Sequence, residues 1–286
     1  FFKQKTAYEI KECDWSSDVC SSDLNPLATP FTLGVSAGAA LGAILVITFG
    51  GGIALGAVSP VPLASLVGAL VATALVYLLA TRPGRTMSTT VLLLAGVTLN
   101  AFFSALILFV QYLADFTQTY RTTRWLMGDL DVGSFEPIVA SLPLVLVSLG
   151  VFGYLSRTLN VLSLGADVAA SRGVDVVRTQ RLAFLSASLG TSAAVALAGP
   201  IGFIGIIVPH LVRLMVGADH RIVLPASALF GAAFLVWCDV LSRVVLAPVE
   251  VPVGVVTAIL GGPFFLWLDR KSTRLNSSHI PLSRMP

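Results

Sequence analysis

Apolar residues dominate this chain in long runs that short polar stretches interrupt. A helix that crosses the hydrocarbon core of a bilayer needs about 20 mainly apolar residues. Runs near that length predict membrane-spanning helices at 32–49, 60–80, 89–113, 136–155, 180–198, 201–216, 222–246 and 252–268. The run at 201–216 is the shortest of them. The pattern therefore predicts an all-α fold, a polytopic transmembrane helix bundle with about eight spans.

Composition places this bundle in a lipid bilayer. The 286 residues are 56% hydrophobic and 12% charged, with a mean hydropathy of +0.88. A soluble domain of this size cannot bury so much apolar surface, whereas a bilayer can accommodate it. The net charge of +3 is small and scattered over the loops, which argues against nucleic acid as a partner.

The two ends differ in composition from the middle. Residues 25–268 contain no lysine, whereas residues 1–24 are rich in charge and include Cys13 and Cys20. Residues 269–286 are rich in serine and arginine. Both ends resemble translated sequencing-library adapter, so we expect them to be non-native tails and exclude them from the fold.

Arginine distribution predicts the orientation. Alternation of the predicted spans places one set of arginines on the side of residue 25, namely Arg82, Arg85, Arg157, Arg172, Arg178, Arg181, Arg213 and Arg221. The opposite side receives Arg121, Arg124 and Arg243. Because cytoplasmic loops carry the excess of basic residues, the first side is predicted to be cytoplasmic.

Small residues recur on the first predicted helix. Gly34, Gly38 and Gly42 are spaced four residues apart, which favours close helix packing in lipid. They do not form a phosphate-binding loop, because no Gly-Lys-Ser/Thr follows them. The sequence contains no such motif elsewhere, so we expect any ATP to be hydrolysed by another chain and this chain not to be an enzyme.

A polar stripe follows the helix predicted at 89–113. Gly96, Asn100, Ser104 and Gln111 lie on one side of that helix at 3.6 residues per turn. Such a stripe either lines a water-filled pathway or forms hydrogen bonds to a neighbouring helix, and the pattern alone favours neither.

The loop after the fourth span is long enough to hold a short helix. Asp167, Ala170 and Val174 recur at helical spacing, and Gly165 and Gly173 bracket them. An ordinary interfacial helix and a segment that docks on a partner protein both fit this pattern.

Several long motifs occur in the order found in FecCD-type permeases. They are Asn25-Pro26-Leu27-Ala28-Thr29-Pro30, Leu94-Ala95-Gly96-Val97, Trp125-Leu-Met-Gly128, the run from Ala198 to Arg221, and Glu250-Val-Pro-Val-Gly254. The chain thus resembles, over residues 25–268, the membrane subunits of ABC importers for iron-siderophores, haem and cobalamin. Members of that family usually have ten spans, so the resemblance implies that two spans before residue 25 are absent.

The resemblance also implies roles for particular residues. The stripe of Gly96, Asn100, Ser104 and Gln111 would line the translocation pathway. The segment that couples to the ATPase subunit would comprise Leu164, Gly165, Ala166, Asp167, Ala170, Arg172 and Gly173, with Arg172 standing where the family usually has leucine. The implied partners are that ATPase, a second permease subunit in a homo- or heterodimer, and an extracytoplasmic substrate-binding protein. No cofactor is implied.

The outer arginines have two interpretations. Arg121, Arg124 and Arg243 would meet acidic residues of the binding protein, or they would only balance Asp115, Asp129, Asp131 and Glu136 of this chain.

Ion-coupled secondary transport is the alternative function. Asp239 is an acid within a predicted span, and Arg243 follows it by one helical turn as a partner. His210 and Arg213 do not suggest a metal site, because no Cys, Glu or second His has the spacing to complete one. We expect these two residues to be structural.

Overall fold

A computed structural model describes residues 34–50, 60–81, 89–131, 135–245 and 247–264. The predicted tails, 1–24 and 269–286, and the Asn25–Pro30 motif lie outside this part of the chain. The helices are α2 (Ser36–Phe49), α3 (Pro60–Ala80), α4 (Thr89–Leu113), α5 (Phe116–Met127), α6 (Glu136–Leu162), α7 (Ala166–Ser171), α8 (Val176–Ala198), α9 (Ile204–Val216) and α10 (His220–Val244). A further helix, Val253–Phe264, follows them.

Each of the eight predicted spans contains a helix, which confirms the all-α membrane bundle. Five helices are long and apolar enough to cross a membrane: α3, α4 from Val91, α6, α8 and α10. The other three apolar helices, α2, α9 and Val253–Phe264, are shorter within the described residues. The segment predicted at 201–216 is one of these, because α9 begins only at Ile204, after Phe203 adopts a left-handed φ of 68°.

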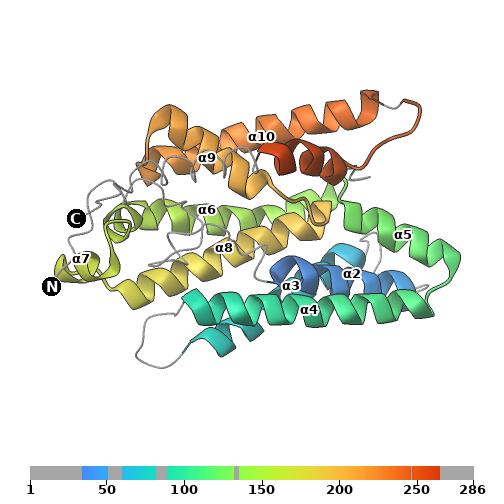
Figure 1. Ribbon diagram of the computed structural model, residues 1–286, viewed down its shortest axis with the longest axis horizontal. Helices are drawn as coiled ribbons and strands as arrows, with labels where there is room; N and C mark the ends of the chain where they lie inside the picture. Colours follow the sequence, from blue (N-terminus) through green and yellow to red (C-terminus); the bar gives the residue numbers. More distant parts are fainter. Residues whose placement is uncertain (1–33, 51–59, 82–88, 132–134, 246, 265–286) are drawn as a thin grey trace, which may run out of the picture.

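The helices form three layers in the view of Figure 1. The layer of α2, α3 and α4 lies on one side, α6 and α8 occupy the middle, and α9, α10 and the last helix lie on the other side. Helix α8 packs against both α6 and α3, while α10 packs against α9 and α6. The short helix α7 lies at one end of the bundle and α5 lies toward the other. We refer to these as the α7 end and the α5 end.

Glycines bring α2 and α3 into backbone contact, as their spacing predicts. A Cβ on residue 38 would lie 2.7 Å from the carbonyl oxygen of Gly68, and one on residue 42 would collide with the carbonyl oxygen of Ala64. Gly34 plays a different part, because its φ is 91° and it lies against the backbone of Gly96 on α4. At the crossing of α2 and α3, small residues therefore let the two backbones touch, where larger side chains would hold them apart.

Two helices extend well past their predicted boundaries. Helix α6 continues to Leu162 rather than residue 155, and α8 begins at Val176 rather than residue 180. Asp175 causes the early start of α8, because its side chain accepts the backbone N–H of Arg178 at 2.9 Å as an N-cap. Arg157 and Arg178 fall between the predicted spans 136–155 and 180–198, and they lie on α6 and α8 instead. Helical hydrogen bonds continue past the apolar run, which hydropathy alone does not detect.

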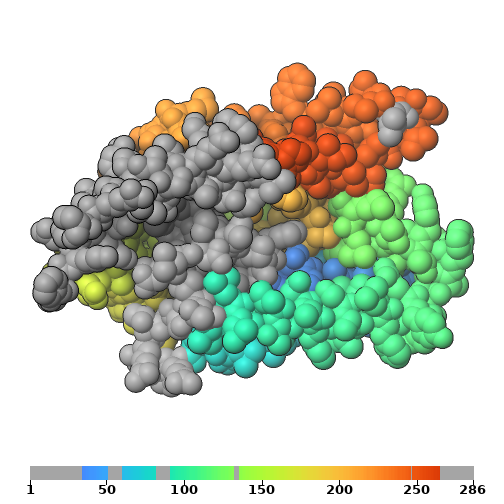
Figure 2. Space-filling model, in the orientation of Figure 1, coloured from blue at the N-terminus to red at the C-terminus, as the bar shows by residue number. Residues whose placement is uncertain are grey.

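Much of the surface is apolar. Helix α4 borders one side of the molecule with a ridge of exposed side chains (Figure 2). These include Leu94 and Leu108, which are each 67% exposed, and Phe109, which is 60% exposed. Such a surface suits lipid or an apolar partner rather than water.

Candidate functional site

The segment predicted to couple to an ATPase forms a compact helical turn at the α7 end. Helix α7 begins after Gly165, which has φ 112°, and ends at Ser171, with Arg172 as its C-cap. Two backbone hydrogen bonds close its C-terminus: Gly173 N–H donates to Ala170 at 2.9 Å, and Val174 N–H donates to Ala169 at 3.0 Å. This is a Schellman motif, with Gly173 in the left-handed position at φ 80°. The predicted short helix between Gly165 and Gly173 is confirmed.

One side of α7 is held by the bundle and the other faces outward. Ala169 is fully buried in an apolar cluster that includes Leu159 and Leu162 of α6 and Val176 of α8. The predicted coupling residues Leu164, Gly165, Asp167, Ala170, Arg172 and Gly173 are exposed, and Ala166 is partly buried. Ala169 thus anchors α7 to the bundle, and the exposed side of α7 presents apolar and charged groups that a partner protein can contact.

A polar contact beside this cluster was not foreseen from the sequence. Asn160, near the end of α6, donates from its side-chain amide to the Asp219 carboxylate at 2.7 Å. The side-chain oxygen of Asn160, Oδ1, accepts the backbone N–H of His220 at 2.9 Å. Asp219 is the N-cap of α10, and His220 is its buried first residue. Asp before an apolar helix was a readable cap, but nothing in the sequence pointed to Asn160.

The residues of the polar stripe on α4 lie in two different environments, one buried and one exposed. Gly96 is buried against Gly34, which precedes α2, so it serves helix packing. Asn100 and Ser104 are exposed, and Gln111 is partly exposed. Their side chains form no hydrogen bond to any residue in the described part of the chain. The stripe therefore faces the surface of this chain at Asn100 and Ser104.

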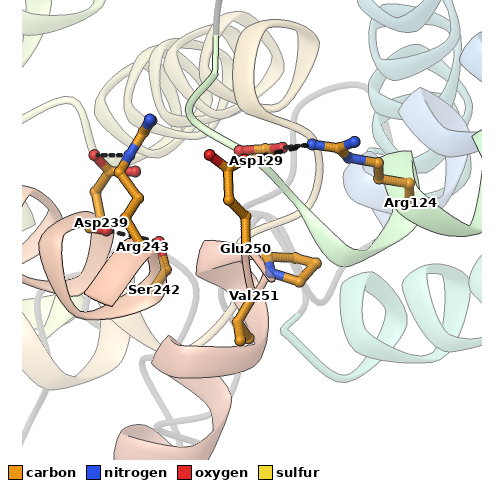
Figure 3. Close-up of a pocket in the computed structure, with 8 residues that line it drawn as sticks. Arg124, Asp129, Asp239, Ser242, Arg243, Glu250 and Val251 are labelled. Carbon is orange, nitrogen blue, oxygen red and sulfur yellow. Dashed lines mark hydrogen bonds and ion pairs between the residues drawn. The ribbon is translucent and has the colours of Figure 1, made fainter. Parts of the chain in front are cut away.

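Acidic and basic side chains gather in a recess at the α5 end (Figure 3). Arg124 of α5 lies 3.3 Å from the Asp129 carboxylate and 3.9 Å from that of Glu250. On α10, Arg243 donates to Asp239 at 3.0 Å. Glu250 extends between these two ion pairs, and all five residues line the recess. The recess joins α5, α10 and the segment before the last helix.

These contacts bear on the predicted roles of the outer arginines. Arg124 and Arg243 each have an acidic partner within the chain, while Arg121 is exposed on α5 and forms no ion pair within the described ranges. Asp115, predicted as one of the balancing acids, instead caps α5 by accepting the N–H of Gln118 at 2.8 Å. Asp239 was predicted within a span, and it lies near the end of α10 in the recess.

Three glycines lie where the segments around the recess meet. Gly128 follows α5 with φ 75°, Gly199 follows α8 with φ 70°, and Gly254 opens the last helix. The N–H of Gly254 donates to the Gly128 carbonyl at 3.4 Å. A Cβ on residue 254 would collide with the carbonyl oxygen of Met127, and one on residue 199 would lie 2.6 Å from that of Trp125. Three distant segments thus meet through their backbones.

The sequence profile of the FecCD transport family matches residues 24–271. The chain belongs to the FecCD transport family. Its predicted membership is thereby confirmed, and with it the multi-pass membrane character of the chain.

Two relatives show the range of the family. The chain is 45% identical over 246 residues to the cobalamin import system permease protein BtuC of Halobacterium salinarum, covering 86% of this chain and 64% of that protein. It is 41% identical over 248 residues to the hemin transport system permease protein HmuU of Yersinia pestis, covering 85% of this chain and 73% of that protein. This chain therefore spans less than two thirds of the archaeal relative.

A solved structure shares the fold. It is assigned to the metal-chelate type of ABC transporter in an inward-facing conformation, and it superposes with a TM-score of 0.77 at 31% identity. The match covers 90% of this chain and 80% of that one. The relatives are permease proteins of import systems, which agrees with the class predicted from the sequence.

Proposed function

We propose that this chain is the membrane permease subunit of an ABC importer that carries a large chelate such as a corrinoid, haem or an iron(III)-siderophore. The observation that supports this most directly is α7, a capped helix that the bundle holds by Ala169 and leaves open to a partner on its other face. A separate ATPase would dock there. The α7 end would then face the cytoplasm, in agreement with the arginine distribution.

The other partners follow from the remaining surfaces. A second permease subunit would cover the exposed stripe of α4, so that Asn100 and Ser104 line a pathway between the two chains. A substrate-binding protein would approach the α5 end, where Arg121 is exposed and Arg124 and Arg243 exchange their internal partners for acids of the binding protein. In the cycle, closure of the ATPase dimer would move α7, and the helices would change which side of the membrane the pathway faces.

Uptake into proteoliposomes tests this proposal. The permease, its ATPase and its binding protein are reconstituted, and uptake of cyanocobalamin, haemin and a ferric hydroxamate complex is measured with and without ATP. We expect ATP-dependent uptake of one of these probes. The matched variants are Leu164→Ala and Asp167→Ala on the exposed side of the α7 segment, with Gly262→Ala in open space on the last helix as the control. The α7 variants should lower uptake and the control should not.

A gradient-driven result would overturn the proposal. Uptake that persists without ATP and collapses when an ionophore dissipates the proton or sodium gradient would support the secondary-transporter alternative. The structure gives little support to the secondary-transporter alternative, because Asp239 lies in a partly exposed recess and pairs with Arg243 at 3.0 Å.

A further inference from the structure

The side chain of Asn160 joins α6 to the start of α10 through hydrogen bonds. Asn160 donates to Asp219 and accepts from the N–H of His220, while the Nδ1 atom of His220 lies 2.5 Å from the same Asn160 oxygen. The residues are about 60 positions apart in the chain, so the contact is tertiary rather than local. His220 is only 3% exposed, which shields its bonds from competing water.

The charge of Asp219 strengthens this contact. The backbone N–H of Arg221, and after it the Asn160 amide, hold the pKa of Asp219 below its usual value. The carboxylate is therefore ionised at neutral pH, and Asn160 donates to a full negative charge. Hydrogen bonds to an ionised acceptor are shorter and stronger than neutral ones.

Apolar packing at the same place is less restrictive. Leu224 of α10 packs against the cluster that contains Leu159 and Leu162 of α6 and Ala169 of α7. Apolar contact has no preferred direction, so it permits one helix to slide on another. The Asn160 bonds are directional, and they fix α10 relative to the end of α6 from which α7 follows.

Helix α10 connects this contact to the recess at the other end. Its 25 residues run from His220 to Val244 and correspond to about 37 Å of helix. At its C-terminal end Asp239 and Arg243 line the recess with Arg124 and Glu250. One continuous helix thus begins at the α7 end and terminates at the α5 end.

We propose that Asn160 is a positioning residue that ties α10 to the C-terminal end of α6, so that a displacement of α7 moves α10 and reaches the recess at the α5 end. The inference rests on the proposed function of α7 as the segment that docks on the ATPase. Without the Asn160 bonds, α6 and α7 would move while α10 slides at Leu224. ATP hydrolysis would continue, and fewer substrate molecules would be carried for each ATP.

The first test measures uptake and ATP hydrolysis together in the reconstituted importer. Asn160→Ala should lower the number of substrate molecules carried per ATP by about tenfold, the scale of losing both the hydrogen bond to Asp219 and the one from the N–H of His220. Ser163→Ala is the matched control, because the Ser163 hydroxyl donates only to the Asn160 carbonyl within the same helix end. A reduced rate of hydrolysis with an unchanged ratio would overturn the inference.

An exchange of the amide and the carboxylate between residues 160 and 219 distinguishes loss of the Asn160–Asp219 bond from a general loss of stability. Asn160→Asp faces Asp219 with a second carboxylate and should lower the ratio at least as far as Asn160→Ala. Adding Asp219→Asn supplies an amide that donates back to residue 160, while residue 160 still accepts the N–H of His220. The double variant should recover most of the ratio. Failure to recover it, in a chain that assembles and binds its partners, would contradict the role of the Asn160–Asp219 bond.

A measurement without substrate tests the tie between α6 and α10 separately from the proposed function. Spin labels at Ser171→Cys on α7 and Ala228→Cys on α10, in a chain whose own cysteines are replaced by serine and diluted with unlabelled chain, report the distance between these helices in nanodiscs. We expect a narrow distribution in the parent and in Ser163→Ala, and a broad one in Asn160→Ala. Equal widths would overturn the inference, whereas a parent that transports none of the probes would count against the proposed function alone.

Discussion

Gly38 and Gly68 set the distance between α2 and α3: a Cβ on residue 38 would lie 2.7 Å from the Gly68 carbonyl oxygen and 2.5 Å from the Cβ of Ala72. Both obstacles belong to short, rigid groups, so the helices themselves would have to separate. Gly38→Ala should therefore destabilise the bundle by about 1–3 kcal/mol, less the gain of about 1 kcal/mol that alanine brings to a helix.

Thermal unfolding of the detergent-solubilised chain measures this effect. Gly150→Ala is the matched control, because Gly150 lies on α6 with no atom within 4 Å of its added Cβ. We expect Tm to fall for Gly38→Ala and to stay level or rise for Gly150→Ala. Equal shifts in the two variants would show that the close approach of α2 and α3 is not required.

The backbone contacts among Gly128, Gly199 and Gly254 should be equally sensitive to an added methyl group. Gly254→Ala places a Cβ against the carbonyl oxygen of Met127, while Gly262→Ala on the same helix meets no atom within 4 Å. We expect Gly254→Ala alone to lower Tm and to increase amide hydrogen exchange at Asp129, whose N–H donates to the Ala198 carbonyl at 2.9 Å. Unchanged exchange at Asp129 would contradict a shared junction.

The Schellman motif of α7 gives a graded prediction. Gly173 has φ 80°, a conformation that costs most L-residues about 1 kcal/mol and that asparagine tolerates better than alanine. Gly173→Ala should increase hydrogen exchange at Val174, and Gly173→Asn should do so less. If the two variants exchange alike, the left-handed residue is not what holds the end of α7.

Binding-protein affinity should depend on which arginine is changed. Arg121 is exposed and unpaired within the described residues, whereas Arg243 must give up its 3.0 Å contact with Asp239 before it can meet an external acid. We expect Arg121→Gln to weaken binding about two- to fivefold, the scale of an exposed ion pair, and Arg243→Gln to weaken it less.

Surface plasmon resonance at low and high salt measures this order. The effect of Arg121→Gln should fall mainly on the association rate and shrink as ionic strength rises, because exposed charges are screened. A larger loss for Arg243→Gln, or a loss independent of salt, would contradict steering by Arg121.

Periodicity and composition were sufficient for much of the architecture. A run such as 60–80 has to be a spanning helix, because lipid offers no partners for its backbone and no other structure satisfies them within one segment. The glycine spacing of α2 predicted a close crossing, and the bracketing of Gly165 and Gly173 predicted a short helix, because both depend on local backbone geometry. The family followed from motifs that retain their order along the chain.

What the sequence left open concerns contacts between distant residues. It grouped Gly96 with Asn100 and Ser104, but packing against Gly34 buries the first and exposes the others. It left open whether the outer arginines meet a partner protein or acids of this chain, and only the fold brings Arg124 to Asp129 and Glu250. Asn160 had no sequence pattern at all, since its partners lie about 60 residues away. The apolar pattern along the chain determined the helices, because each helix satisfies its own backbone in lipid. The tertiary structure alone decided which polar side chains from distant segments meet, because such bonds depend on how the helices are placed against one another.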